Sequence, residues 1–113
     1  MTVTIKDEKI DGKTVVTLDG RIDSSAAVEF ESHMIQVING GCNTMLVDFT
    51  NLVFISSAGL RVLLLAAKKV RPYGGKVLLC ALSQDVQEVF DISGFSSIFS
   101  IYKTRQEAID SMR

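Results

Sequence analysis

From residue 24 onward, segments with helical hydrophobic spacing alternate with short apolar runs that are typical of buried strands. This alternation favours a parallel sheet with helices on its faces, because parallel strands need a crossover connection, which is usually a helix. The sequence therefore predicts an α/β fold with a mixed, mostly parallel central sheet of about five strands and about four helices. The expected strands cover 2–10, 13–20, 44–50, 77–82 and 97–102, and the expected helices cover 26–38, 57–70, 84–92 and 104–112.

Turn and capping residues mark the ends of these segments. Asp11-Gly12 favours a tight turn with positive φ, so the first two strands are expected to form an antiparallel hairpin. In the first helix, Val28, Met34, Ile35 and Ile38 recur near helical spacing and are the expected apolar face. Caps are expected at Ser24 or Ser25 for the first helix, at Ser83 for the third and at Thr104 for the fourth.

Length and composition indicate a single globular domain over residues 1–113. Of the 113 residues, 47% are hydrophobic and 22% charged, so the chain can build a core without a metal or a disulfide. The two cysteines and one histidine cannot form a four-ligand zinc site. Cys80 is expected in the core and Cys42 at the surface, both as free thiols of a reducing compartment.

Charge and hydropathy exclude several classes of partner. The formal net charge is −1, and no run of like charges indicates a basic stripe, so a nucleic-acid partner is not expected. The longest apolar run, 62–67, is far shorter than the ~20 residues of a membrane span. The N-terminal residues lack the pattern of a secretory signal, and a cytoplasmic location is expected.

The central helix, 57–70, leaves its outward side open to two interpretations. A helical wheel directs one side to the sheet, namely Leu60, Leu63, Leu64, Ala67 and Val70. The other side is expected to face solvent and holds Arg61, Val62, Leu65, Lys68 and Lys69, with Ala58 beside them. Val62 and Leu65 either form a docking patch, or they are ordinary surface residues or lie beneath another element.

Two serines, Ser56 and Ser57, stand where this helix begins. A helix cap explains Ser57 but not both serines. A hydrolase nucleophile is not expected, because the G-x-S-x-G elbow would need glycine at Ile55 and the only histidine, His33, is expected at the surface of the first helix. The serines fit a site of modification: a phosphate on Ser57 would face the helix N-terminus, with Arg61 one turn away.

Several separated motifs occur together and in order along the chain. They are GRID at 20–23, DF at 48–49, SSAGL at 56–60, GG at 74–75 and FDISG at 90–94. This set resembles one known family, the STAS-domain anti-sigma factor antagonists of bacteria, and the resemblance extends over roughly residues 3–112. Many members carry Asp-Ser where this chain has Ser-Ser, which leaves Ser56 as a second, less favoured acceptor and leaves the rate of phosphorylation open.

The resemblance implies a binding protein that is switched by phosphorylation and is not an enzyme. Unphosphorylated, it would bind an anti-sigma factor of the serine-kinase type and free the sigma factor; phosphorylation on Ser57 would end binding and a phosphatase would restore it. Together with the helical wheel, this gives the expected partner-binding residues: Asp23, Ser56, Ala58, Gly59, Arg61, Val62 and Leu65.

A second interpretation is a STAS scaffold or accessory subunit, stressosome-like or associated with a lipid transporter, in which Ser57 only caps the helix. Nucleotide binding near Asp23 and the two serines is a weaker possibility, because the chain has no phosphate-cradling Gly-rich loop. No cofactor or metal is expected.

Overall fold

The first two strands form the expected antiparallel hairpin in the computed structural model, which describes residues 3–113. They are β1 (Val3–Ile10) and β2 (Lys13–Ile22). Asp11 and Gly12 between them have φ values of 53° and 79°. Both torsions lie in the left-handed region that a type I′ turn requires, so the turn dipeptide sets the hairpin as predicted.

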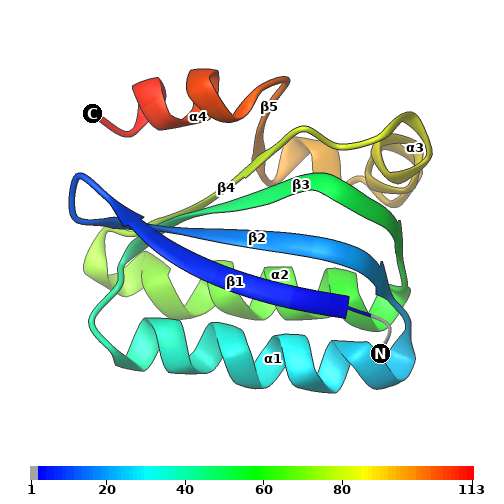
Figure 1. The fold of residues 1–113 in the computed structure, drawn as a ribbon, viewed down its shortest axis with the longest axis horizontal. Coiled ribbons are helices and arrows are strands. Elements are labelled where there is room, and N and C mark those ends of the chain that lie inside the picture. The colour runs from blue at the N-terminus through cyan, green and yellow to red at the C-terminus, as the bar shows by residue number, and fades with distance from the viewer. Residues whose placement is uncertain (1–2) are drawn as a thin grey trace.

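Three further strands extend the sheet in the order β1-β2-β3-β4-β5 (Figure 1). They are β3 (Thr44–Ile55), β4 (Lys76–Cys80) and β5 (Ser100–Tyr102), and each runs parallel to its preceding neighbour. The five-stranded mixed sheet is therefore confirmed, as are its four helices.

The helices divide between the two faces of the sheet. In Figure 1, α1 (Ser24–Asn39) and α2 (Ser57–Val70) lie side by side beneath the sheet, and α4 (Arg105–Ser111) lies above it. The helix α3 (Gln84–Ser93) packs against β3, and the 3₁₀ turns η1 (Arg71–Tyr73) and η2 (Phe95–Ser97) follow α2 and α3. Ser83 and Thr104 cap α3 and α4, as predicted.

Two strand lengths differ from the prediction. β3 continues to Ile55 because β2 pairs with it to its own last residue, Ile22, through two register shifts. β5 is shorter than expected, since the chain folds into η2 over residues 95–97. The Ser97 hydroxyl donates to the Gly94 carbonyl at 2.8 Å and helps to hold that turn.

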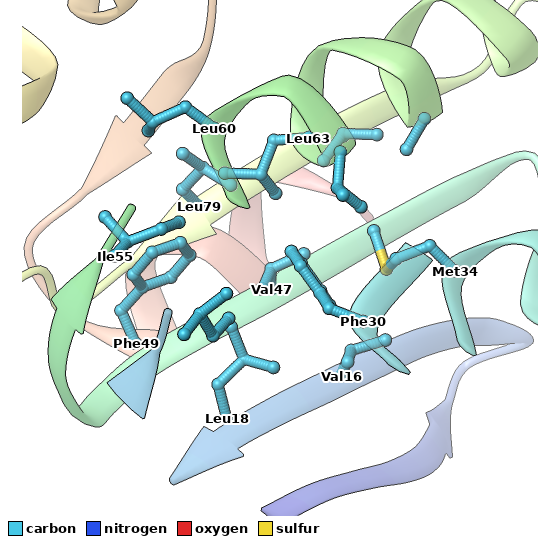
Figure 2. Close-up of a cluster of buried hydrophobic side chains, with 14 of the residues drawn as sticks. Val16, Leu18, Phe30, Met34, Val47, Phe49, Ile55, Leu60, Leu63 and Leu79 are labelled. Carbon is cyan, nitrogen blue, oxygen red and sulfur yellow. The ribbon is translucent and has the colours of Figure 1, made fainter. Parts of the chain in front are cut away.

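The main core fills the space between the sheet and the pair α1 and α2. Figure 2 shows Phe30 and Met34 of α1 and Leu63 of α2 pointing toward side chains of β2 and β3. The predicted apolar face of α1 is partly wrong, because Val28 is 69% exposed. The smaller neighbours Ala26 and Ala27 are buried instead, since α1 turns this face toward both α2 and the sheet.

Both cysteines are buried free thiols in the structure. The surface position expected for Cys42 is wrong, because the chain turns inward after α1 and the Sγ–H donates to the Thr44 carbonyl at 3.2 Å. Cys80 lies in the core as predicted, where desolvation raises the pKa of its thiol to about 12. Neither side chain is accessible for a role at the surface.

The opposite face of the sheet contains a buried ionic contact between Asp48 and Arg105. Asp48 of β3 accepts hydrogen bonds from the Thr50 amide at 2.9 Å and the Thr50 hydroxyl at 2.6 Å. The guanidinium of Arg105 lies 3.2 Å from the same carboxylate and also pairs with Glu8 of β1. Arg105 thus links α4 to β1 and β3 through ion pairs.

Arg105→Met is expected to lower the free energy of unfolding by about 1–3 kcal/mol, because Asp48 would remain buried without its cation. Arg113→Met is the matched control, since Arg113 pairs with Asp11 in an exposed position. The control should cost less than about 1 kcal/mol. Urea denaturation of both variants measures this, and an equal cost for the two would contradict the assignment.

Candidate functional site

β2 and β3 end in register, and this brings two helix N-termini together. Ile22 pairs with Ile55, and the amide of Ser56 donates to the carbonyl of Ile22 at 2.8 Å. Each strand then passes directly into a helix, α1 after Asp23 and α2 after Ser56. The predicted Asp23 and serine segments therefore lie at the same edge of the sheet, at the carboxyl ends of its strands.

Asp23, and not Ser24 or Ser25, caps α1. Its Oδ1 accepts from the Ala26 amide at 2.8 Å and from the Ser25 hydroxyl at 3.0 Å. The hydrogen bond from the Ala26 amide is the main cause that lowers the pKa of the Asp23 carboxyl. The predicted caps are wrong because the helix begins directly after the strand, which leaves Asp23 as the residue with extended backbone at the cap position.

The two serines of the second helix start have different structural roles. Ser56 is the cap of α2: its Oγ accepts from the Gly59 amide at 3.2 Å. Ser57 is the first helical residue and is exposed, and within residues 3–113 its hydroxyl has no hydrogen-bond partner. The interpretation of Ser57 as the cap is therefore wrong.

Gly59 allows the first turn of α2 to pack closely against the ends of β2 and β3. A Cβ at this position would lie 2.7 Å from Cγ1 of Ile55 and 2.9 Å from Cγ2 of Ile22. These separations are too short for any side chain larger than hydrogen. Gly59 is buried, so its structural contribution is close packing, and the partner contact expected of it remains a prediction.

A groove of about 280 Å³ separates the exposed edges of α1 and α2 beside the serines. The predicted solvent exposure is wrong for Val62, which is 4% exposed, and only partly right for Leu65, which is half-buried. The reason is that α1 packs along this side of α2. The groove is lined by Ser24, Ala27, Val28 and Glu31 of α1 and by Ala58, Arg61, Val62 and Leu65 of α2.

The family model for the STAS domain matches residues 4–108. The chain belongs to the STAS domain family. The putative anti-sigma factor antagonist BtrV of Bordetella bronchiseptica is 42% identical over 101 residues, which cover 89% of this chain and 87% of the relative. The anti-sigma F factor antagonist of Paenibacillus polymyxa is 27% identical over 113 residues, 99% of this chain and 97% of the relative.

A solved structure agrees with these relatives. The anti-sigma factor antagonist SpoIIAA in its unphosphorylated form superposes with a TM-score of 0.84 at 25% identity, covering 97% of this chain and 96% of SpoIIAA. The sheet, the helices and their order in this chain are thus those of STAS-domain anti-sigma factor antagonists.

The α1 side of the groove in this STAS domain was missed by the sequence analysis. Ser24, Val28 and Glu31 are spaced at i, i+4 and i+7, which places them on one helix face, but that spacing was not used. Near the ends of β2 and β3, Phe54 is partly exposed and the Arg21 guanidinium lies 4.6 Å from its ring centroid. Nothing in the sequence pattern distinguishes Phe54 from a buried strand residue.

The structure gives little support for nucleophilic catalysis or metal binding at this site. His33 lies about 13 to 14 Å along α1 from the first residue of that helix, and the Nε2 of His33 is 2.6 Å from Oδ1 of Asp7 in β1. It is therefore not positioned to act as a base toward Ser57. Residues 3–113 contain no cluster of three metal-ligating side chains. In the same residues, no helix is long and apolar enough to cross a membrane.

The different roles of the serines lead to a stability test. Ser56→Ala should lower the free energy of unfolding by about 1 kcal/mol, because the Gly59 amide loses its acceptor. Ser57→Ala should change it by less than about 0.5 kcal/mol, since no hydrogen bond is lost. Chemical denaturation measures both variants, and a larger loss for Ser57→Ala would reverse the assignment of the cap.

Proposed function

We propose that this STAS domain is an antagonist of a serine-kinase-type anti-sigma factor and that phosphorylation on Ser57 switches binding off. The observation that carries the proposal is the separation of roles at the start of α2. Ser56 meets the capping requirement, which leaves the Ser57 hydroxyl exposed and unbonded. A kinase can therefore modify Ser57 without removing a contact on which the fold depends. SpoIIAA has been solved in phosphorylated and unphosphorylated forms, which supports a comparable switch here.

The surroundings of Ser57 suit an added phosphate. The residue stands at the positive end of α2, where a negative charge is stabilised by the helix dipole. Arg61 is exposed and one turn further along the same helix. These features support a modification that changes the surface and leaves the stability of the domain level or slightly higher.

The same phosphate would oppose a partner docked on the groove. We infer that the partner contacts Ala58, Leu65 and the rim of the groove. Asp23 and Ser56 would support this surface by capping α1 and α2. Phosphorylation brings about −1.5 to −2 charges to the end of that surface. An unpaired charge in an interface costs about 2–5 kcal/mol, which weakens binding tens to thousands of fold.

The scaffold or accessory-subunit interpretation is less well supported. It depends on Ser57 serving only as a helix cap, and Ser56 occupies that role. An enzymatic role also lacks support, because the one histidine is paired with Asp7 on another part of the domain. In the proposed cycle the chain is the substrate of a kinase and of a phosphatase that removes the phosphate from Ser57.

Incubation with its kinase and ATP should add one phosphate, and peptide mapping should locate it on Ser57. Ser57→Asp should fold normally and bind the anti-sigma factor tens to thousands of fold more weakly than Ser57→Ala, because only the former adds a charge. Mass spectrometry and calorimetric titration measure the two effects. Phosphate found on Ser56 alone, or equal affinities of the two variants, would contradict the proposal.

The groove allows a second test that leaves both serines intact. Leu65→Glu should keep the circular dichroism spectrum and melting temperature close to those of the wild type but weaken binding, because Leu65 is only half-buried. Val62→Glu is the contrasting variant: it buries a carboxylate between α1 and α2 and should destabilise the fold by several kcal/mol. Wild-type affinity in folded Leu65→Glu would remove the groove from the interface.

A further inference from the structure

Positive charge is concentrated on the segment that contains α2. Residues 49–84 contain five Lys and Arg side chains and no Asp or Glu, although the whole chain has a formal charge of −1. All five are exposed: Arg61, Lys68, Lys69, Arg71 and Lys76. No long run of like charges marks this segment in the sequence; it differs from the rest of the chain because it holds no acidic residue that would balance its cations.

These five cations take no part in the ion pairs of the domain. The ion pairs within residues 3–113 are made by Arg105, Arg113 and His33. The helix dipole stabilises Lys68 and Lys69 in the last turn of α2. It does not account for Arg61 in the second turn or for the cations beyond the helix. The fold alone thus gives no reason for this concentration of charge.

The outward face of α2 arranges part of this charge in a line that starts at Ser57. The line follows the spacing i, i+4, i+7, i+11 and i+14, while the opposite face of the helix is buried. From the first to the last residue it is about 21 Å long, which fits within the footprint of one ordinary protein interface. We call this line the basic stripe; its members are Ser57, Arg61, Leu64, Lys68 and Arg71. The prediction that Leu64 faces the sheet is wrong, because the buried face of α2 is centred on Gly59, Leu63, Ala66 and Val70.

A cavity of about 240 Å³ lies at the far end of the basic stripe. Arg71 and Lys76 both line it, together with the hydroxyl-bearing Ser100 and the apolar Ile98. Two cations and a hydroxyl around one cavity suit a carboxylate whose aliphatic stem lies against the apolar wall. An Asp or Glu side chain of a partner has this chemistry.

Resting on the proposed function, we propose that the anti-sigma factor docks along the whole basic stripe through an acidic surface of its own. Arg61 belongs to both the groove and the basic stripe, so the two form one continuous surface. A nucleic acid or an anionic membrane is a poorer match, because α3 exposes Asp85, Glu88 and Asp91 and the domain as a whole is slightly negative. A phosphate on Ser57 then also weakens attraction along the stripe by neutralising its first cation.

Association kinetics test this docking surface. The wild type, Lys68→Glu/Arg71→Glu and the control Lys6→Glu/Lys9→Glu on β1 are each mixed with the serine-kinase-type anti-sigma factor encoded in the same genome, at low and high salt. Both double variants change the net charge equally. The stripe variant should associate at least about tenfold more slowly at low salt, with the difference shrinking at high salt, while the control stays within about twofold of the wild type. Thermal melts should show all three chains folded.

Each outcome has a distinct meaning. If the wild type binds and the stripe variant associates at the wild-type rate, or if the control is slowed equally, the acidic docking surface is overturned and the proposed function stands. If the wild type does not bind the anti-sigma factor, the proposed function fails and this inference with it. Retention of the wild type, but not of the stripe variant, on duplex DNA or phosphatidylserine vesicles in place of the anti-sigma factor would also overturn it.

Discussion

The parallel pairing of β2 with β3 to their last residues is the constraint on which the site depends. The hydrogen bond from the Ser56 amide to the Ile22 carbonyl closes this pairing, so that two helices leave the sheet next to each other. The absence of a side chain at Gly59 lets the first turn of α2 sit directly on Ile22 and Ile55. Together these contacts create both the exposed serine and the groove that runs from it.

A phosphorylation site at a helix start, as proposed for Ser57, conflicts with the need for a cap, and the two adjacent serines of this domain would resolve that conflict. The cap position needs a side-chain acceptor for an otherwise unsatisfied amide, and a phosphorylated cap would lose or distort that contact. Ser56 performs the capping, while Ser57, one position later, projects into solvent. The positive helix end still favours an anion there, so the proposed phosphorylation would affect partner binding without destabilising the fold.

Local signals predicted the order and type of the elements well. The Asp11-Gly12 turn, the caps at Ser83 and Thr104 and the alternation of helices and strands depend on neighbouring residues, whose effects are visible in the sequence. The length of β3 was underestimated, because its last five residues are held by pairing with β2 and not by a hydrophobic pattern of their own. The burial of Cys42 likewise depends on how the chain turns after α1.

The sequence alone determined which residues lie close together at the site. Asp23, the two serines and the first turn of α2 all follow the ends of neighbouring strands in a parallel sheet. Only the tertiary structure decided what each of them faces. A helical period defines a face but not the neighbour that covers it, so Val62 is buried by α1 while Val28 is left exposed. The cap is the residue between the last strand residue and the first helical residue. Because β3 ends at Ile55, Ser56 caps α2 and Ser57 does not. The cations of the basic stripe, Arg61, Lys68 and Arg71, are likewise not adjacent in the sequence, and the helical period aligns them on one face.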